Sequence, residues 1–386
     1  MTRLVSIDIL RGIAILGILF MNITYHANIE LGYISLDVAI LSDEIISIFN
    51  TLFVDGRFRS LFCLLFGVGL AIQYESCLKK NGEPIPFLKT RLNWLFVFGF
   101  IHGVFIFGGD ILMLYSLSGM LVIKSLDLSL EPLFQKAKQY LVIGSILSLI
   151  IFLLVIGTYD SSESISRGSE TYLEQINRWY GNYFYQVKTQ SVFSLGLLLL
   201  SFFFIFWEIA GLMYLGIYLY RSDFFHKGFE NSTFIKVLIA GILLSILSLL
   251  PQLMAIPGER DVKEVIASVP AIFIALIYAH IIVKIANNKS KLLTLLASSG
   301  KLAFTLYIMQ SICMAILLRW IIPEFNIHAT LLDYFLIAVI FIILQLTLAQ
   351  AYLRYFEQGP LEFLWRKLYL KNMKSNQLKL SNDHDT

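Results

Sequence analysis

The sequence predicts an all-α membrane protein: a polytopic bundle of about ten transmembrane helices with both termini in the cytoplasm. Composition is the first observation, because the 386 residues are 57% hydrophobic and only 15% charged, with a mean hydropathy of +0.74. A soluble domain has about 25% charged residues. Apolar runs of about 20 residues, the length that crosses a bilayer, recur along the chain, and Lys and Arg gather in alternate loops.

Ten apolar segments are candidate spans, although several are shorter than about 20 residues. The first carries Arg11 and no small-residue cleavage site follows it, so we expect a retained span rather than a signal peptide. Residues 44–54 are apolar but too short to cross, and we expect them to lie at the interface or to lead into the second span. The candidate spans are 7–25, 60–74, 92–107, 111–126, 139–157, 191–220, 234–256, 265–286, 302–320 and 332–352.

Basic residues orient these spans. With the N-terminus in the cytoplasm, roughly 22 of the 30 Lys and Arg residues fall on the cytoplasmic side. The largest loop on the other side, residues 158–190, has an aromatic cluster in its second half, which favours an interfacial helix or a lid over an outward cavity. We expect residues 1–371 to form a single integral-membrane domain and the polar residues 372–386 to form a disordered cytoplasmic tail.

Other function classes receive no support. The net charge of +3 is too small to suggest nucleic-acid binding. The cysteines Cys63, Cys77 and Cys313 are scattered and form no CxxC pair, so we expect no structural disulfide and no zinc site. The chain also contains no phosphate-binding loop, no GxSxG and no HExxH motif. We therefore expect no metal.

The first span carries polar residues at both ends. Asp8 and Arg11 are three residues apart on one helix face, where they form either an interfacial ion pair or part of a binding site. Asn22 and His26 follow at the other end. Arg11 and Asn22 are three helical turns apart, about 16 Å along the same side of the helix. These residues could therefore line one face of a cavity.

The stretch FGFIHGVFIFGGDILMLYSL places a base and an acid in an apolar segment. On one continuous helix His102 and Asp110 would be about 12 Å apart. Gly108 and Gly109 break that helix, so the chain can turn and bring the carboxylate back towards the imidazole. Such a pair holds one tautomer and raises the basicity of the ring. The alternatives are an interhelical hydrogen bond for His102 and an N-cap role for Asp110.

Five further residues are polar at or near span depth. Arg57 and Arg59 lie on the outer side, against the charge rule, where they could bind an anionic or carbonyl group or anchor to lipid phosphates. Glu208 lies within the sixth span, and we consider Glu208 and Gln310 as substrate-binding candidates. We interpret His280 as an interhelical hydrogen-bonding residue.

Several of these segments match one family in order. The segments SIDILRGIAILGILFMNI, DGRFRSLFCLLFGVG, GDILMLYSLSGML with His102 before it, and GKLAFTLYIMQS with QGPLEFLWRKL resemble the YeiB-like bacterial membrane proteins. That family is grouped with transmembrane acyltransferases such as heparan-alpha-glucosaminide N-acetyltransferase and the bacterial sugar O-acyltransferases. The resemblance implies about ten spans in the bacterial cytoplasmic membrane, acyl-CoA as co-substrate and no metal or redox cofactor.

The resemblance also suggests roles. His102 or His26 would be the general base, with Asp110 orienting it, and Arg11 would meet the phosphates of acyl-CoA. The sugar O-acyltransferases have a histidine where this chain has Asn22, whereas the glucosaminide enzyme has an asparagine there and a histidine slightly further on, which His26 matches loosely. The asparagine of the family's LTNY pattern is replaced by Leu306.

Two functions are therefore predicted. In the first, an integral-membrane acyltransferase moves an acyl group from cytoplasmic acyl-CoA to a hydroxyl or amine of an envelope glycan, a lipid or a small molecule, with Arg57 or Arg59 binding the acyl carbonyl or the acceptor. In the alternative, a transporter or lipid-handling protein uses Glu208 and His280 as protonation sites. A structural or sensory membrane protein is a third possibility. Binding of CoA discriminates between the first two.

Overall fold

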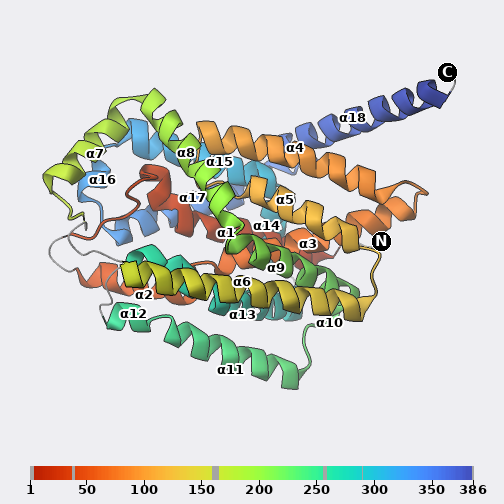
Figure 1. Cartoon of the computed structure of the whole chain (residues 1–386), viewed down its shortest axis with the longest axis horizontal. Coiled ribbons are helices and arrows are strands. Elements are labelled where there is room, and N and C mark those ends of the chain that lie inside the picture. Colours follow the sequence, from red (N-terminus) through yellow and green to blue (C-terminus); the bar gives the residue numbers. More distant parts are fainter. Residues whose placement is uncertain (1–3, 37–39, 159–164, 255–258, 289, 385–386) are drawn as a thin grey trace.

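The computed structural model describes residues 4–36, 40–158, 165–254, 259–288 and 290–384, and all regular elements in these ranges are helices (Figure 1). The elements are α1 (Val5–Ala27), α2 (Leu41–Phe53), α3 (Arg57–Leu78), α4 (Pro84–Phe105), α5 (Leu112–Val122), η1 (Ile123–Ser125), α6 (Leu130–Thr158), α7 (Glu170–Gly181), α8 (Tyr183–Ser201), α9 (Ile205–Arg221), α10 (Phe224–Lys227), α11 (Asn231–Leu247), α12 (Leu250–Leu253), α13 (Glu259–Ile285), α14 (Lys291–Lys301), α15 (Ala303–Ala315), η3 (Ile316–Ile321), α16 (Phe325–His328), α17 (Leu331–Tyr352) and α18 (Pro360–His384).

The described helices form a multi-pass bundle. Seven helical segments are long and apolar enough to cross a membrane, and α8 with α9, which meet at a 68° bend, would make an eighth. The predicted third and fourth spans correspond to α4, whose first half carries Lys89 and Arg91, and to α5, which has only 11 residues. The count of about ten, the cytoplasmic placement of both termini and the division at residue 371 stay predictions.

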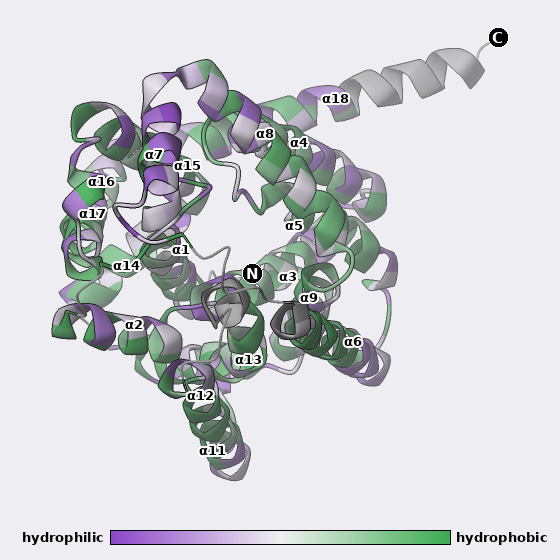
Figure 2. Cartoon of the chain, turned by 60° about the vertical axis from the view of Figure 1, so that its left-hand side comes forward, coloured by the Kyte–Doolittle hydropathy of each residue, from purple (hydrophilic) through white to green (hydrophobic). Residues whose placement is uncertain are grey.

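Burial separates inner from outer helices. In the most apolar stretches of α1 and α13, 67% of the residues are buried, whereas the value is 17% in α6, α11 with α12, and α17. Figure 2 shows α6 and α11 at the periphery with largely hydrophobic surfaces, as expected of helices that face lipid tails. The candidate site described below also lies inside the bundle, because its central residues His102 and Asp110 are buried.

Glycines let the inner helices approach closely. A Cβ added at Gly67 of α3 would lie 2.1 Å from the carbonyl oxygen of Met213 on α9, and one added at Gly216 of α9 would lie 2.0 Å from that of Leu64 on α3. The two helices therefore pack backbone to backbone, as small residues permit in membrane bundles.

The outer loop 158–190 contributes helix α7, which packs over the end of α1. Ser169 caps α7 by accepting a hydrogen bond from Tyr172 N at 3.2 Å. The indole Nε1 of Trp179 donates to Ala27 O at 2.7 Å, and the Tyr180 hydroxyl donates to the same oxygen at 3.3 Å. The aromatic cluster thus holds the last turn of α1 in place, and Figure 2 shows α7 as a hydrophilic helix. Residues 159–164 lie outside the described residues.

We predict that Gly216→Ala destabilises the bundle by about 1–3 kcal/mol, because the new methyl group forces α3 and α9 apart. Gly196→Ala on α8 is the matched control, since nothing lies within 4 Å of its added Cβ. Thermal unfolding in detergent, followed by tryptophan fluorescence, measures the difference. Equal melting temperatures for the two variants would contradict the proposed close packing.

Candidate functional site

The site is built on the elbow (residues 106–111) that joins α4 to α5. Helix α4 ends here because Ile106 N and Phe107 N both donate to His102 O, each at 2.9 Å. A Cβ at Gly108 would lie 2.9 Å from Gln190 O, and a Cβ at Gly109 would lie 2.7 Å from the Phe107 ring. Both glycines are therefore needed for close approach, and the chain turns where the sequence predicted a break.

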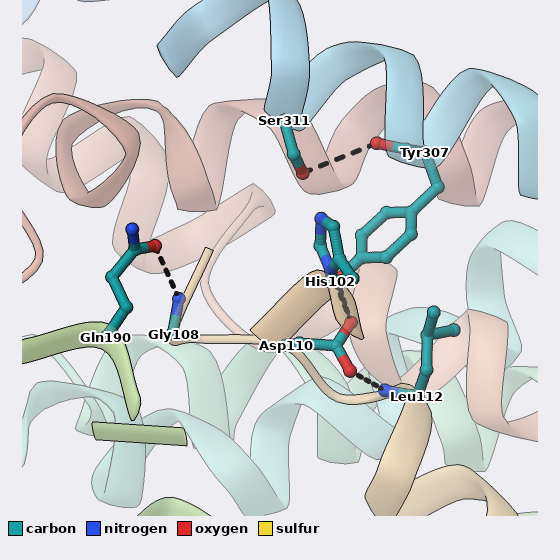
Figure 3. Close-up of polar contacts among 7 residues, drawn as sticks. All are labelled: His102, Gly108, Asp110, Leu112, Gln190, Tyr307 and Ser311. Carbon is teal, nitrogen blue, oxygen red and sulfur yellow. Dashed lines mark hydrogen bonds and ion pairs between the residues drawn. The ribbon is translucent and has the colours of Figure 1, made fainter. Parts of the chain in front are cut away.

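The elbow brings His102 and Asp110 together inside the bundle. His102 Nδ1 lies 2.8 Å from Asp110 Oδ1, and the two residues are 2% and 3% exposed (Figure 3). The other carboxylate oxygen, Oδ2, accepts from Leu112 N at 2.9 Å, so Asp110 also serves the first turn of α5. With its proton on Nδ1, the imidazole carries its lone pair on Nε2. That atom is buried and has no hydrogen-bond partner among the described residues.

Tyr307 on α15 is the third partner of the carboxylate. Its hydroxyl donates to Asp110 Oδ1 at 3.1 Å, and its ring centroid lies 5.2 Å from that of His102. The start of α15 is held by Glu362 of α18, whose Oε1 accepts from Phe304 N at 2.8 Å and from Thr305 N at 3.1 Å. A carboxylate at a helix N-terminus is favourable. Glu362 therefore fixes the turn from which Tyr307 reaches the pair.

Two cavities meet at Tyr307. The Asn22 cavity, of about 450 Å³, is lined by Asn22, Glu30 and Arg59 among mostly apolar residues, and by the glycines of the elbow. The Arg91 cavity, of about 220 Å³, is lined by Arg91 and by Arg11. Tyr307 lines both of them. A substrate in either cavity would thus be next to a residue that contacts the His102–Asp110 pair.

A third cavity extends the Arg91 cavity towards the beginning of α1. The Arg221 cavity has a volume of about 680 Å³ and shares Arg11 and Gln73 with the Arg91 cavity. Arg11 pairs with Asp8 at 3.7 Å, as the spacing predicted, yet its side chain also faces both cavities. Arg221 itself bonds Glu75 at 3.2 Å. Arg11 and Asn22 thus mark two cavities about 16 Å apart along α1.

Other predicted residues lie elsewhere. Arg57 is 0% exposed, donates to Asp55 O at 2.5 Å and lines none of the three cavities, whereas Arg59 lines the Asn22 cavity. Gln310 also lines none of them; its Nε2 donates to Ile15 O at 3.2 Å and to Gln345 Oε1 at 2.8 Å, which ties α1, α15 and α17 together.

Glu208 and His280, the two residues of the transporter interpretation, have different surroundings. Glu208 is buried on α9, where its backbone approaches Gly144 of α6. The His280 ring accepts from Phe229 N at 3.0 Å and stacks on Phe234 with centroids 4.0 Å apart. His280 therefore bonds the connection between α10 and α11, whereas an interhelical hydrogen bond was predicted for it. Neither residue lines the three cavities described above.

His26 does not contact Asp110, the carboxylate that was expected to orient the general base. It is 1% exposed, its ring stacks on Phe107 with centroids 4.1 Å apart, and no carboxylate bonds it among the described residues. Its carbonyl oxygen accepts from Arg319 Nε at 2.6 Å. Of the two candidate bases, His102 alone has the acid partner that orients an imidazole.

The sequence analysis missed Tyr307, Gln190 and Arg319. Gln190 Oε1 accepts from Gly108 N at 3.1 Å (Figure 3), and Arg319 Nη1 donates to Ile106 O at 3.1 Å. Arg319 is an arginine inside a predicted span, so its charge was an available signal. Tyr307 and Gln190 carry no such signal. Within the described ranges no group of three or more His, Cys, Asp or Glu residues is arranged to hold a metal ion.

Comparison with known proteins finds relatives along almost the whole chain. Residues 219–372, which include Tyr307 and Glu362, match a family described as "Protein of unknown function (DUF418)". The chain is 26% identical to the uncharacterized protein YeiB of Escherichia coli, over 96% of this chain and 97% of YeiB. It is also 26% identical to the uncharacterized protein YxaH of Bacillus subtilis, over 94% and 93% of the two chains. No solved structure matches.

We predict that Asp110→Ala destabilises the protein by about 3–5 kcal/mol, because the His102 ring, the Tyr307 hydroxyl and Leu112 N all lose a buried acceptor. Asp127→Ala, at an exposed position in the turn before α6, is the control. Thermal unfolding in detergent compares the two variants. If Asp110→Ala melts no lower than Asp127→Ala, the carboxylate does not organise the elbow.

Proposed function

We propose that the chain is a YeiB-like bacterial membrane protein and that it acts as an integral-membrane acyltransferase, which moves an acyl group from cytoplasmic acyl-CoA to a hydroxyl or amine acceptor. One observation carries the proposal. The buried pair of His102 and Asp110 has Tyr307 as its third partner, and Tyr307 lines two separate cavities. That arrangement suits a reaction between two substrates that arrive from opposite ends of the bundle.

The Arg91 and Arg221 cavities are the proposed path of acyl-CoA. The guanidinium of Arg91 is stacked over the Trp365 ring at 3.9 Å from its centroid, which holds a rigid donor fork at the cavity wall. Arg11 and Lys301 line the same cavity. Arginine and lysine bind phosphate groups well, and a stacked arginine loses little entropy on binding. The acyl end of the pantetheine arm would then point towards Tyr307.

The Asn22 cavity is the proposed acceptor site. Its wall is formed in part by Gly108 and Gly109, so an acceptor would lie directly against the elbow. Asn22, Glu30 and Arg59 offer it hydrogen-bonding groups. The remaining lining is apolar and aromatic, which suits the body of an envelope glycan, a lipid or a small amphiphile. Arg59 keeps its predicted place in the acceptor site in this proposal, whereas Arg57 has none.

The chemistry follows from the tautomer of His102. Nε2 takes the proton of the acceptor hydroxyl or neutral amine while the acceptor atom bonds to the thioester carbonyl carbon. The carbonyl electrons move to oxygen, then return as the carbon–sulfur bond breaks. The thiolate of CoA leaves and takes the proton from His102, which restores the neutral ring. Asp110 stays ionised throughout and stabilises the imidazolium.

We predict that purified protein in detergent binds CoA. It should also slowly cleave acetyl-CoA or a longer acyl-CoA, which releases free CoA. His102→Ala should lower kcat by about 10²–10⁴-fold, because the general base is lost, whereas His26→Ala should have a smaller effect. His328→Ala, at an exposed position, is the control. The proposal fails if no variant, the wild type included, binds CoA or releases it.

A second prediction concerns the donor path. Arg91→Gln should raise the KM for acyl-CoA about tenfold with little change in kcat, because one phosphate contact is lost before the chemical step. Arg366→Gln, an exposed arginine on the neighbouring α18, should leave KM within about twofold. Steady-state kinetics over a range of acyl-CoA concentrations separates the two parameters. A change confined to kcat in Arg91→Gln would place the CoA elsewhere.

A further inference from the structure

Four buried nitrogen atoms surround the elbow without a hydrogen-bond partner among the described residues. They belong to His26, His102, Gln190 and Arg319, which are 1%, 2%, 0% and 3% exposed. The atoms are His26 Nδ1, His102 Nε2, Gln190 Nε2 and Arg319 Nη2. A buried donor or acceptor that lacks a hydrogen-bond partner costs about 1–3 kcal/mol, more when it is charged. A folded protein that retains several of them at one place needs a reason.

Each of these side chains is anchored to the elbow by its other atoms. Gln190 Oε1 accepts from Gly108 N at 3.1 Å, which leaves its amide nitrogen free. Arg319 donates from Nη1 to Ile106 O at 3.1 Å and from Nε to His26 O at 2.6 Å. Figure 3 shows the Gln190 amide nitrogen and the unpaired ring nitrogen of His102 pointing to the same side of the elbow. These contacts fix the side chains of Gln190 and Arg319, so their free nitrogens cannot turn towards other partners.

Two of these groups can only donate hydrogen bonds. The guanidinium of Arg319 and the amide nitrogen of Gln190 can only donate, and Arg319 also carries a positive charge. His102, whose ring lies 6.2 Å from the Phe107 ring of the same elbow, carries at Nε2 the acceptor that the proposed mechanism needs. Two buried donors and a base, all anchored at one elbow, are suited to an oxygen that carries or develops negative charge.

The backbone around Arg319 explains how its side chain reaches the elbow. Residues Ile316–Ile321 form a π-helix, η3, which follows α15. The wider turn shifts the register of the helix face, and such turns are frequent at functional sites. The guanidinium lies at 5.2 Å from the ring centroid of Trp179, which is 0% exposed and is itself bonded to Ala27 O. Arg319 is therefore held on three sides.

Phe107 separates the nitrogens from the Asn22 cavity. The Phe107 ring lines that cavity, and it lies 4.1 Å from the His26 ring and 6.2 Å from the His102 ring, measured between centroids. Rotation of this one side chain would open the space between the two histidines to the cavity. A substrate in the cavity could then place its reacting group against the free nitrogens.

We propose that Gln190 Nε2 and Arg319 Nη2 form a binding niche for the acyl carbonyl oxygen and for the oxyanion that it becomes during transfer. This inference rests on the proposed acyltransferase function for its substrate, but its chemical basis is the donor set alone. The niche assigns to Arg319 the binding of the acyl carbonyl, which was one of the two roles predicted for Arg57 or Arg59. The same donors should therefore also accept a simple carboxylate.

Gln190→Glu is the discriminating variant. The carboxylate keeps an acceptor for Gly108 N, so the elbow is preserved, but it removes the free donor and adds a negative charge. We expect kcat for CoA release to fall about 100-fold with KM for acyl-CoA unchanged within about twofold, as for the loss of an oxyanion donor. Gln190→Met, which removes both contacts, should lower kcat as well and should also lower the melting temperature.

A binding measurement tests the niche without relying on turnover. Acetate, titrated into the protein in lipid nanodiscs, should raise the melting temperature of the wild type and leave that of Gln190→Glu unchanged. If acetate stabilises only the wild type while no variant releases CoA, the niche stands and the acyltransferase proposal falls. If Gln190→Glu keeps both its kcat and its response to acetate, the niche proposal is overturned, whatever the outcome for CoA.

Discussion

The arrangement depends on one buried carboxylate. Asp110 accepts hydrogen bonds from His102 on α4, from Leu112 N at the start of α5 and from the Tyr307 hydroxyl on α15. In an apolar bundle each of these donors would be costly to leave unpaired, so the three segments are obliged to meet at this point. The elbow glycines are needed for the same reason, because a side chain at Gly108 would collide with Gln190. The fold and the candidate site are thus set by the same interaction.

The meeting point gives the bundle its chemical asymmetry. On one side of Tyr307 lies a cavity with Arg11 and Arg91, and on the other lies a larger, mostly apolar cavity with Asn22. In the proposed reaction, acyl-CoA and an acceptor of different character would therefore approach one base without sharing a path. Peripheral helices such as α11 contribute little to this arrangement, and their exposed apolar faces are typical of helices that contact lipid tails.

Composition and the lengths of the apolar runs were enough to predict an all-helical membrane bundle, and the predicted first span, 7–25, lies within α1. The approach of His102 to Asp110 was foreseeable because two glycines between them break the helix. Tyr307 was not, because it comes from a segment 197 residues away and tyrosine is common in membrane helices. The sequence also could not tell which of Arg57 and Arg59 faces the cavity, since residues two apart on a helix point to different sides. The charge of Arg319 inside a predicted span was a signal in the sequence, but its contacts with Ile106 O and His26 O come only from the fold.

Accessibility of the two cavities from opposite faces of the membrane is the most direct test of the account. Single cysteines at Gln73 and Asn22, in a chain whose Cys63, Cys77 and Cys313 are replaced by serine, can be labelled with an impermeant maleimide in right-side-out and inverted vesicles. We predict that Gln73→Cys reacts only from the cytoplasmic face and is protected by CoA, and that Asn22→Cys reacts only from the other face. Labelling of both positions from the same face would contradict a site served from two sides.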